Sequence, residues 1–134
     1  MKKSKKIMVA VLALALMLGM NLVVYASATA LLYSNETTKT TACVGNSNEC
    51  FYWWGNVGST SEYPVEFIMY GGKNSANCSM VLKRKTVSIG GSFSPVKVSA
   101  SSSSFSVGKV TMCGNNSSNL KTQCIAGAGI SSTN

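Results

Sequence analysis

Residues 63–70 of the chain read YPVEFIMY, and their side chains alternate regularly. In an extended chain, neighbouring side chains point to opposite faces. The odd-numbered residues of this segment are apolar or aromatic and share one face, whereas Glu66 lies on the other. Pro64 stands near the start, where a missing backbone amide is tolerated. The pattern predicts a half-buried β-strand.

Similar short runs, separated by turn residues, occur on both sides of this segment. Gly45-Asn46-Ser47-Asn48, residues 71–75 and Gly90-Gly91 are strong turn signals. Beyond residue 30, no segment places apolar residues at helical spacing over three turns. We therefore expect further strands over residues 29–33, 37–44, 49–54, 78–89, 92–100, 104–113 and 120–130.

This strand count predicts an all-β domain with a turn every ten or so residues. Each sheet has one apolar face to cover, so a small antiparallel β-sandwich of about seven or eight short strands is the expected fold. A small closed β-barrel is the alternative. We place this single domain, with its polar C-terminal tail, at residues 31–134.

The N-terminus has the order of features that marks a secretory signal peptide. Four lysines within residues 2–6 precede an apolar run over residues 7–20, and two small-residue triplets follow, ending at Ala28 and Ala30. We therefore expect a cleaved, helical signal peptide over residues 1–30, cut after Ala28 or Ala30, and an extracellular protein. An uncleaved N-terminal membrane anchor is a minor alternative, because the apolar run is nearly long enough to span a bilayer.

The charge of the exported part is modest. The whole chain has 12 basic and 4 acidic residues, and removing the four signal-peptide lysines leaves a net charge of about +4. This excess is too small and too scattered to predict a nucleic-acid partner. An anionic membrane surface or an envelope polymer remains compatible with it.

Missing residue types argue against an enzyme. The chain has no histidine and no aspartate, and its acids are four glutamates. Most hydrolytic chemistry uses histidine, paired carboxylates or a metal that such groups hold. We therefore expect no enzymatic activity, no cofactor and no metal site. An enzyme would need an unusual serine, lysine or cysteine nucleophile, for which Cys78 is the best candidate.

The five cysteines should pair where geometry allows, because exported proteins meet an oxidising environment. Cys43 and Cys50 flank one predicted turn, and Cys113 and Cys124 flank another. If both turns close hairpins, the preferred bonds are Cys43–Cys50 and Cys113–Cys124. Cys78 is then unpaired, which suggests a buried thiol or, alternatively, a Cys78-linked dimer. Pairings that join distant strands, with Cys78 bonded to a cysteine of either turn, stay open.

Phe51-Tyr52-Trp53-Trp54 is the most conspicuous local feature. In a strand, Phe51 and Trp53 point one way and Tyr52 and Trp54 the other, so one pair can fill the core. The second pair is either covered by the following loop, residues 55–62, or available to stack on sugar rings or lie at a membrane interface. We take Tyr52, Trp53 and Trp54 as candidate binding residues.

Lys83-Arg84-Lys85 lies within a predicted strand, with Lys83 and Lys85 on one face. These lysines are either candidate contacts for anionic polymers or a charged guard on an edge strand. The sequence as a whole predicts a secreted, non-enzymatic binding protein that acts on carbohydrate or another envelope component. The alternative is a bacteriocin-like antimicrobial protein that acts on anionic cell envelopes. The oligomeric state is not predicted.

Overall fold

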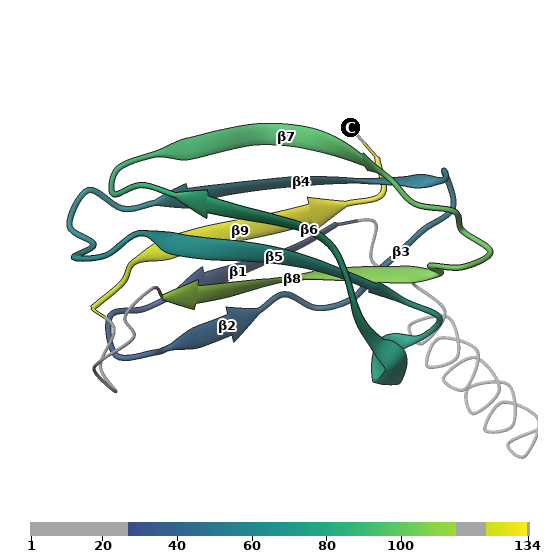
Figure 1. The fold of residues 1–134 in the computed structure, drawn as a ribbon, viewed down its shortest axis with the longest axis horizontal. Coiled ribbons are helices and arrows are strands. Elements are labelled where there is room, and N and C mark those ends of the chain that lie inside the picture. The colour runs from purple at the N-terminus through teal and green to yellow at the C-terminus, as the bar shows by residue number, and fades with distance from the viewer. Residues whose placement is uncertain (1–26, 115–122, 134) are drawn as a thin grey trace, which may run out of the picture.

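The computed structural model describes residues 27–114 and 123–133, and these residues form two antiparallel sheets (Figure 1). The first sheet has the strand order β1 (Ser27–Leu32), β9 (Ala126–Ser131), β4 (Cys50–Val57) and β7 (Ser92–Ser99). The second has the order β2 (Thr38–Thr40), β8 (Val107–Gly114), β5 (Val65–Gly72) and β6 (Cys78–Val87). The short strand β3 (Val44–Gly45) also pairs with β8, and one 3-10 turn, η1 (Ser75–Asn77), precedes β6.

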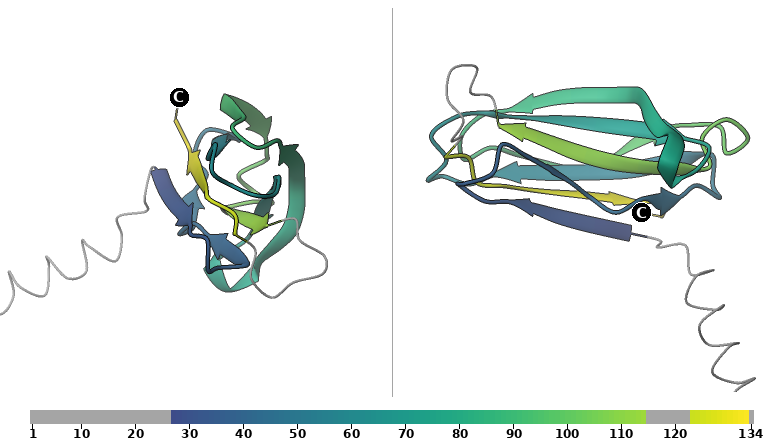
Figure 2. Two further views of the ribbon diagram at one scale, coloured as in Figure 1. Left: turned by 90° about the vertical axis from the view of Figure 1, so that its left-hand side faces the viewer. Right: turned by 90° about the horizontal axis from the view of Figure 1, so that it is seen from below.

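The sheets pack face to face as two layers, which the view along the strands shows (Figure 2). The predicted β-sandwich is therefore confirmed. The barrel alternative is wrong, because the described strands form two separate sheets and none of them belongs to both. Within the described residues, no helix has the length and apolar character needed to cross a membrane.

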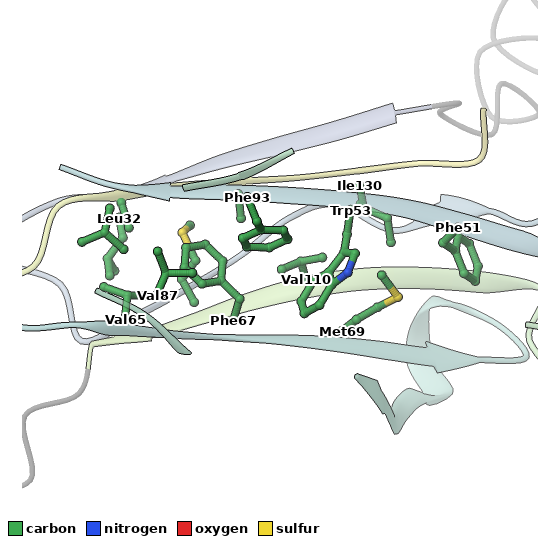
Figure 3. Packing of buried hydrophobic residues seen from close by; sticks show 14 of the residues in the cluster. Leu32, Phe51, Trp53, Val65, Phe67, Met69, Val87, Phe93, Val110 and Ile130 are labelled. Atoms are coloured by element: carbon green, nitrogen blue, oxygen red, sulfur yellow. The ribbon is translucent and has the colours of Figure 1, made fainter. Parts of the chain in front are cut away.

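The core lies between the layers and takes the inward-facing residues of both (Figure 3). The alternation in residues 63–70 is confirmed: Val65, Phe67 and Met69 of β5 are fully buried. Glu66 faces outward and forms an ion pair with Arg84 of β6, with 3.0 Å between Oε1 and Nη1. β5 is flanked by β8 and β6, so its inward face carries much of the core of the second sheet.

Several element bounds differ from the sequence-based expectation. β4 continues through Gly55 to Val57, so the predicted loop over residues 55–62 begins later. The predicted strand 37–44 is split into β2 and β3. β1 begins at Ser27, so the predicted boundary between residues 30 and 31 falls inside a strand. Residues 1–26 of the predicted signal peptide and residues 120–122 of the predicted last strand lie outside the described residues.

Candidate functional site

The aromatic run divides between the two faces of β4, as its alternation predicts. Phe51 is fully buried and Trp53 is 2 % exposed. The Trp53 ring meets Phe93 of β7 edge-on, with 5.0 Å between ring centroids. Because Trp53 is a core residue, no ligand on the surface reaches it. Its prediction as a binding residue is therefore wrong.

Tyr52 and Trp54 lie on the outer face of the first sheet, and both are partly exposed. Trp54 pairs with Gly129 of β9, and a Cβ atom on Gly129 would overlap the indole. The indole therefore rests against the backbone of β9, which only a residue without a side chain permits. This contact holds the ring on a rigid strand while part of it stays open to solvent.

Neighbouring strands surround the two rings with polar and apolar side chains. Tyr52 pairs with Lys97 of β7 on one side and with Ser131 of β9 on the other. Thr29 of β1 lies beyond Gly129 in the Trp54 row. In the next row, Asn56 reaches over Gly127 toward Leu31, which is 56 % exposed. We name this surface the aromatic shelf and define it by six residues: Thr29, Leu31, Tyr52, Trp54, Asn56 and Lys97.

The aromatic shelf has the chemistry of a stacking surface. Aromatic side chains offer a large apolar face, and their rings bind well where one side is apolar and the other is wet. Asn56 and Thr29 can donate and accept hydrogen bonds at the margin, and Lys97 adds one positive charge. The two central rings were found by alternation in the sequence. The flat backbone of β9 under the Trp54 indole was not predicted. It arises because glycine occupies both outward positions, 127 and 129, in Ala126-Gly127-Ala128-Gly129, and the pairing of these glycines with β4 is not visible in the sequence.

The loop that follows β4 is attached to the end of the sandwich. The Ser61 hydroxyl donates to the Tyr63 carbonyl at 2.9 Å and accepts from the Ile125 amide at 3.2 Å. The Gly58 amide donates to the Ile125 carbonyl at 2.7 Å. These bonds fix the loop beside the start of β9, and Tyr52 and Trp54 stay partly exposed.

Lys83 and Lys85 lie on β6, which is an edge strand of the second sheet, as one of the two interpretations requires. The Lys85 ammonium lies 5.0 Å from the centre of the Phe93 ring of β7, so it covers the open side of the core between the sheets. Arg84, on the opposite face, is paired with Glu66. Two of the three basic residues therefore have partners within the fold.

All five cysteines are free thiols in the structure. The hairpins assumed for the bonds Cys43–Cys50 and Cys113–Cys124 do not form. Cys43 precedes β3 in the second sheet, whereas Cys50 begins β4 in the first. Cys113 belongs to the second sheet and Cys124 precedes β9 of the first. The strands that flank each predicted turn thus belong to different sheets, and the geometric basis of both pairings is wrong.

Two thiols are shifted in acidity by their surroundings. Burial, and next the neighbouring Cys43 thiol, raises the pKa of Cys78 to about 11. Burial, and next the Glu66 carboxylate, raises the pKa of Cys113. A raised pKa disfavours the thiolate, which is the nucleophilic form. Among the described residues, no cluster of three histidine, cysteine, aspartate or glutamate side chains is suited to hold a metal ion.

No protein-family model matches the chain, and no curated protein matches it in sequence. Among solved structures, "Crystal structure of PirA" is similar at 9 % identity and a TM-score of 0.47, over 80 % of this chain and 93 % of the other. "Bacillus endospore appendages form a novel family of disulfide-linked pili" is similar at 12 % and 0.41, over 78 % and 83 %. "Family 16 Carbohydrate Binding Module-2" is similar at 13 % and 0.39, over 75 % and 70 %. These likenesses are too weak to carry an argument about function.

Proposed function

We propose that this chain is an exported β-sandwich that binds carbohydrate of a cell envelope or an extracellular matrix through the aromatic shelf. The single observation that supports this most is the Trp54 indole resting on Gly129. It places a partly exposed aromatic ring on a rigid sheet. Tyr52 occupies the next outward position of the same strand. Two rings along one strand suit a chain of sugar residues better than a small globular ligand.

The surroundings of the rings also favour a sugar polymer. A sugar ring presents apolar C–H faces and polar hydroxyl edges, so it needs an aromatic face with hydrogen-bonding groups beside it. Thr29 supplies such groups in the same cross-strand row as Trp54, and Asn56 supplies them in the next row. The surface is open rather than a closed pocket, which suits a long or insoluble polymer.

Export is part of the proposal and rests on the N-terminal sequence. The structure bears on the site of cleavage. All six residues of β1 pair with β9, and a cut after Ala30 would remove four of them. The triplet Val24-Tyr25-Ala26 ends in alanine and has the short side chain of Val24 two positions earlier, so it resembles a cleavage site. A cut after Ala26 keeps all six described residues of β1, so we propose Ser27 as the first residue of the mature protein.

A binding assay with a matched control tests the carbohydrate proposal. The protein is mixed with insoluble polysaccharides, namely chitin, cellulose and purified peptidoglycan, and the bound fraction is measured after sedimentation. The parent protein should bind at least one of these polymers, and Trp54→Ala should lose most of that binding. Tyr70→Ala, which removes a partly exposed ring from the other sheet, should bind like the parent. Equal binding by both variants and the parent contradicts the proposal.

The bacteriocin-like alternative is addressed by a second arm of the same assay. Lys85 and Arg84 have partners within the fold, which leaves fewer basic residues free for an anionic membrane. We therefore expect no leakage of a dye from vesicles of anionic phospholipid. If vesicles do leak and Trp54→Ala abolishes the leakage, the aromatic shelf binds lipid rather than carbohydrate.

A further inference from the structure

Two of the five thiols approach each other on the outer face of the second sheet. Cys78 begins β6 and pairs with Gly72 of β5. Its Sγ lies 3.6 Å from the Tyr70 carbonyl oxygen and 3.9 Å from that of Val107 in β8. The Cys78 thiol therefore lies over β5, within reach of backbone oxygens of both β5 and β8.

The turn before β6 produces this position. η1 follows Asn74, whose side chain accepts a hydrogen bond from the Asn77 amide at 2.9 Å. The turn then returns so closely over β5 that a Cβ on Gly72 would overlap the Asn77 carbonyl. Because Gly72 has no side chain, Cys78 can lie over the sheet rather than at its edge.

Cys43 reaches the same place from the other edge of β8. It precedes β3, where Val44 pairs with Gly108 and Gly45 pairs with Val107. Val44 is fully buried in the core, so Cys43, its neighbour, faces outward. Cys78 contacts the carbonyl of the same Val107. The two side chains thus converge over β8, and Cys43 is the neighbouring thiol that contributes to the raised pKa of Cys78.

The other cysteines offer neither thiol a partner. Cys50 and Cys124 are buried, and they belong to the start of β4 and the approach to β9 in the first sheet. Cys113 does face outward on β8, beside Glu66. It lies six residues from Val107 along the strand, which is roughly 20 Å. Such a separation excludes a bond without rearrangement of the sheet.

We propose that Cys43 and Cys78 form a disulfide in the exported protein, which joins the β3 edge of the second sheet to the start of β6. This proposal rests on the export in the proposed function. The oxidant is a small or protein disulfide. One protein thiolate attacks a sulfur of that disulfide and releases one thiolate of the oxidant. The second protein thiolate attacks the mixed disulfide, which closes the Cys43–Cys78 bond and releases the other thiolate.

The order of the two attacks follows from exposure. Cys43 is partly exposed and Cys78 is buried, so the oxidant reaches Cys43 first. Cys78 then closes the bond from its place over β8. The net change is the loss of two hydrogen atoms from the protein, and the oxidant is reduced to two thiols.

The test uses the full chain, purified in reduced form and then equilibrated with oxidised and reduced glutathione. Free thiols are alkylated, the protein is digested without reduction, and the masses of the peptides are measured by mass spectrometry. We expect one cross-linked pair, Cys43 with Cys78, two hydrogen masses lighter than the two free peptides. Alkylation of both thiols, a stable glutathione adduct, a bond to another cysteine or a disulfide-linked dimer would overturn the proposal.

Variants keep the result interpretable. Reduction should lower the Tm of the parent and of the control Cys113→Ser by about 10 °C or more, because the bond closes a loop of about 35 residues. Reduction should not change the Tm of Cys43→Ser. If Cys43→Ser fails to fold, the parent with and without reductant still answers the question. Because the bond forms in vitro, a positive result stands even where N-terminal sequencing shows that the chain is not exported.

Discussion

Trp53 and Trp54 are adjacent in sequence and have opposite environments. Trp53 is buried against Phe93 in the core, whereas Trp54 rests on β9 at the surface. Trp53→Ala should therefore lower the free energy of unfolding by about 3–5 kcal/mol, the usual cost of removing a large core ring. Trp54→Ala should cost about 1 kcal/mol or less, because most surface substitutions have small effects. Urea denaturation measures both, and equal losses would contradict this division.

Gly129 offers a test that leaves every aromatic ring in place. In Gly129→Ala the new methyl group overlaps the Trp54 indole and displaces it from β9. We expect loss of polysaccharide binding comparable to that of Trp54→Ala, together with a red shift of tryptophan fluorescence as the ring enters water. Gly58→Ala is the control, because its methyl group meets Ile125 and no residue of the aromatic shelf. Unchanged binding in Gly129→Ala would show that the contact between Trp54 and Gly129 is not needed for binding.

The sequence predicted those features of these residues that depend on a single strand. The faces of Phe51, Tyr52, Trp53 and Trp54 follow from period-two alternation alone. Which pair is buried follows from the partner strands, and those are distant in sequence. Gly129 pairs with Trp54 across 75 positions, so no local pattern reveals that the indole lies on it.

At the scale of elements, the pairing of β1 supports the start that we propose for the mature protein. Its residues pair with β9 from Ser27↔Ser131 to Leu32↔Ala126, and two of the aromatic shelf residues, Thr29 and Leu31, belong to it. N-terminal sequencing of protein recovered from the culture medium should therefore find Ser27 first. A start at Leu31 would leave β1 with two paired residues and would contradict the role of Thr29. An intact Met1 would contradict cleavage.

The strands themselves were largely predictable, and their partners were not. The position of β5, β7 and β8 follows from alternation between turn signals. The turn at residues 45–48 was equally clear, yet it carries the chain from β3 in one sheet to β4 in the other. Turn signals show that the chain reverses, and they are silent about whether it stays in its sheet. For this reason the hairpins assumed for the preferred cysteine pairings do not form.

At the scale of the whole molecule, two connections between the layers are tied together at one end. Residues 46–49 lead from β3 to β4, and residues 100–106 lead from β7 to β8. The side-chain nitrogen Nδ2 of Asn46 donates to the carbonyls of Ala100 and Phe105 at 2.8 and 3.1 Å. The Glu49 carboxylate accepts from the amide and the hydroxyl of Ser102. Side chains of one connection thus satisfy backbone groups of the other, which holds both sheets in one arrangement.

Glu49 makes this connection sensitive to acid. The Ser102 hydroxyl, and next the Ser102 amide, holds the pKa of Glu49 below its ordinary value of 4.5. The folded state therefore binds this proton less readily than the unfolded chain does. The stabilising contribution is fully present above the unfolded value and is lost as the pH falls through the folded value. Glu36, held the same way by the Tyr33 amide and then by Lys39, adds to the same trend.

We expect Glu49→Gln to be less stable than the parent at pH 7 and to approach the parent's stability as the pH falls below 4. Glutamine keeps the size of the side chain and removes the charge that strengthens the bonds to Ser102. Ser102→Ala is the second arm, because it removes the hydroxyl donor and leaves the amide. Urea denaturation of the parent, both single variants and the double variant, at pH 7 and pH 3, measures the coupling between the two side chains. A coupling that persists undiminished at pH 3 would show that the carboxylate charge is not what joins the two connections.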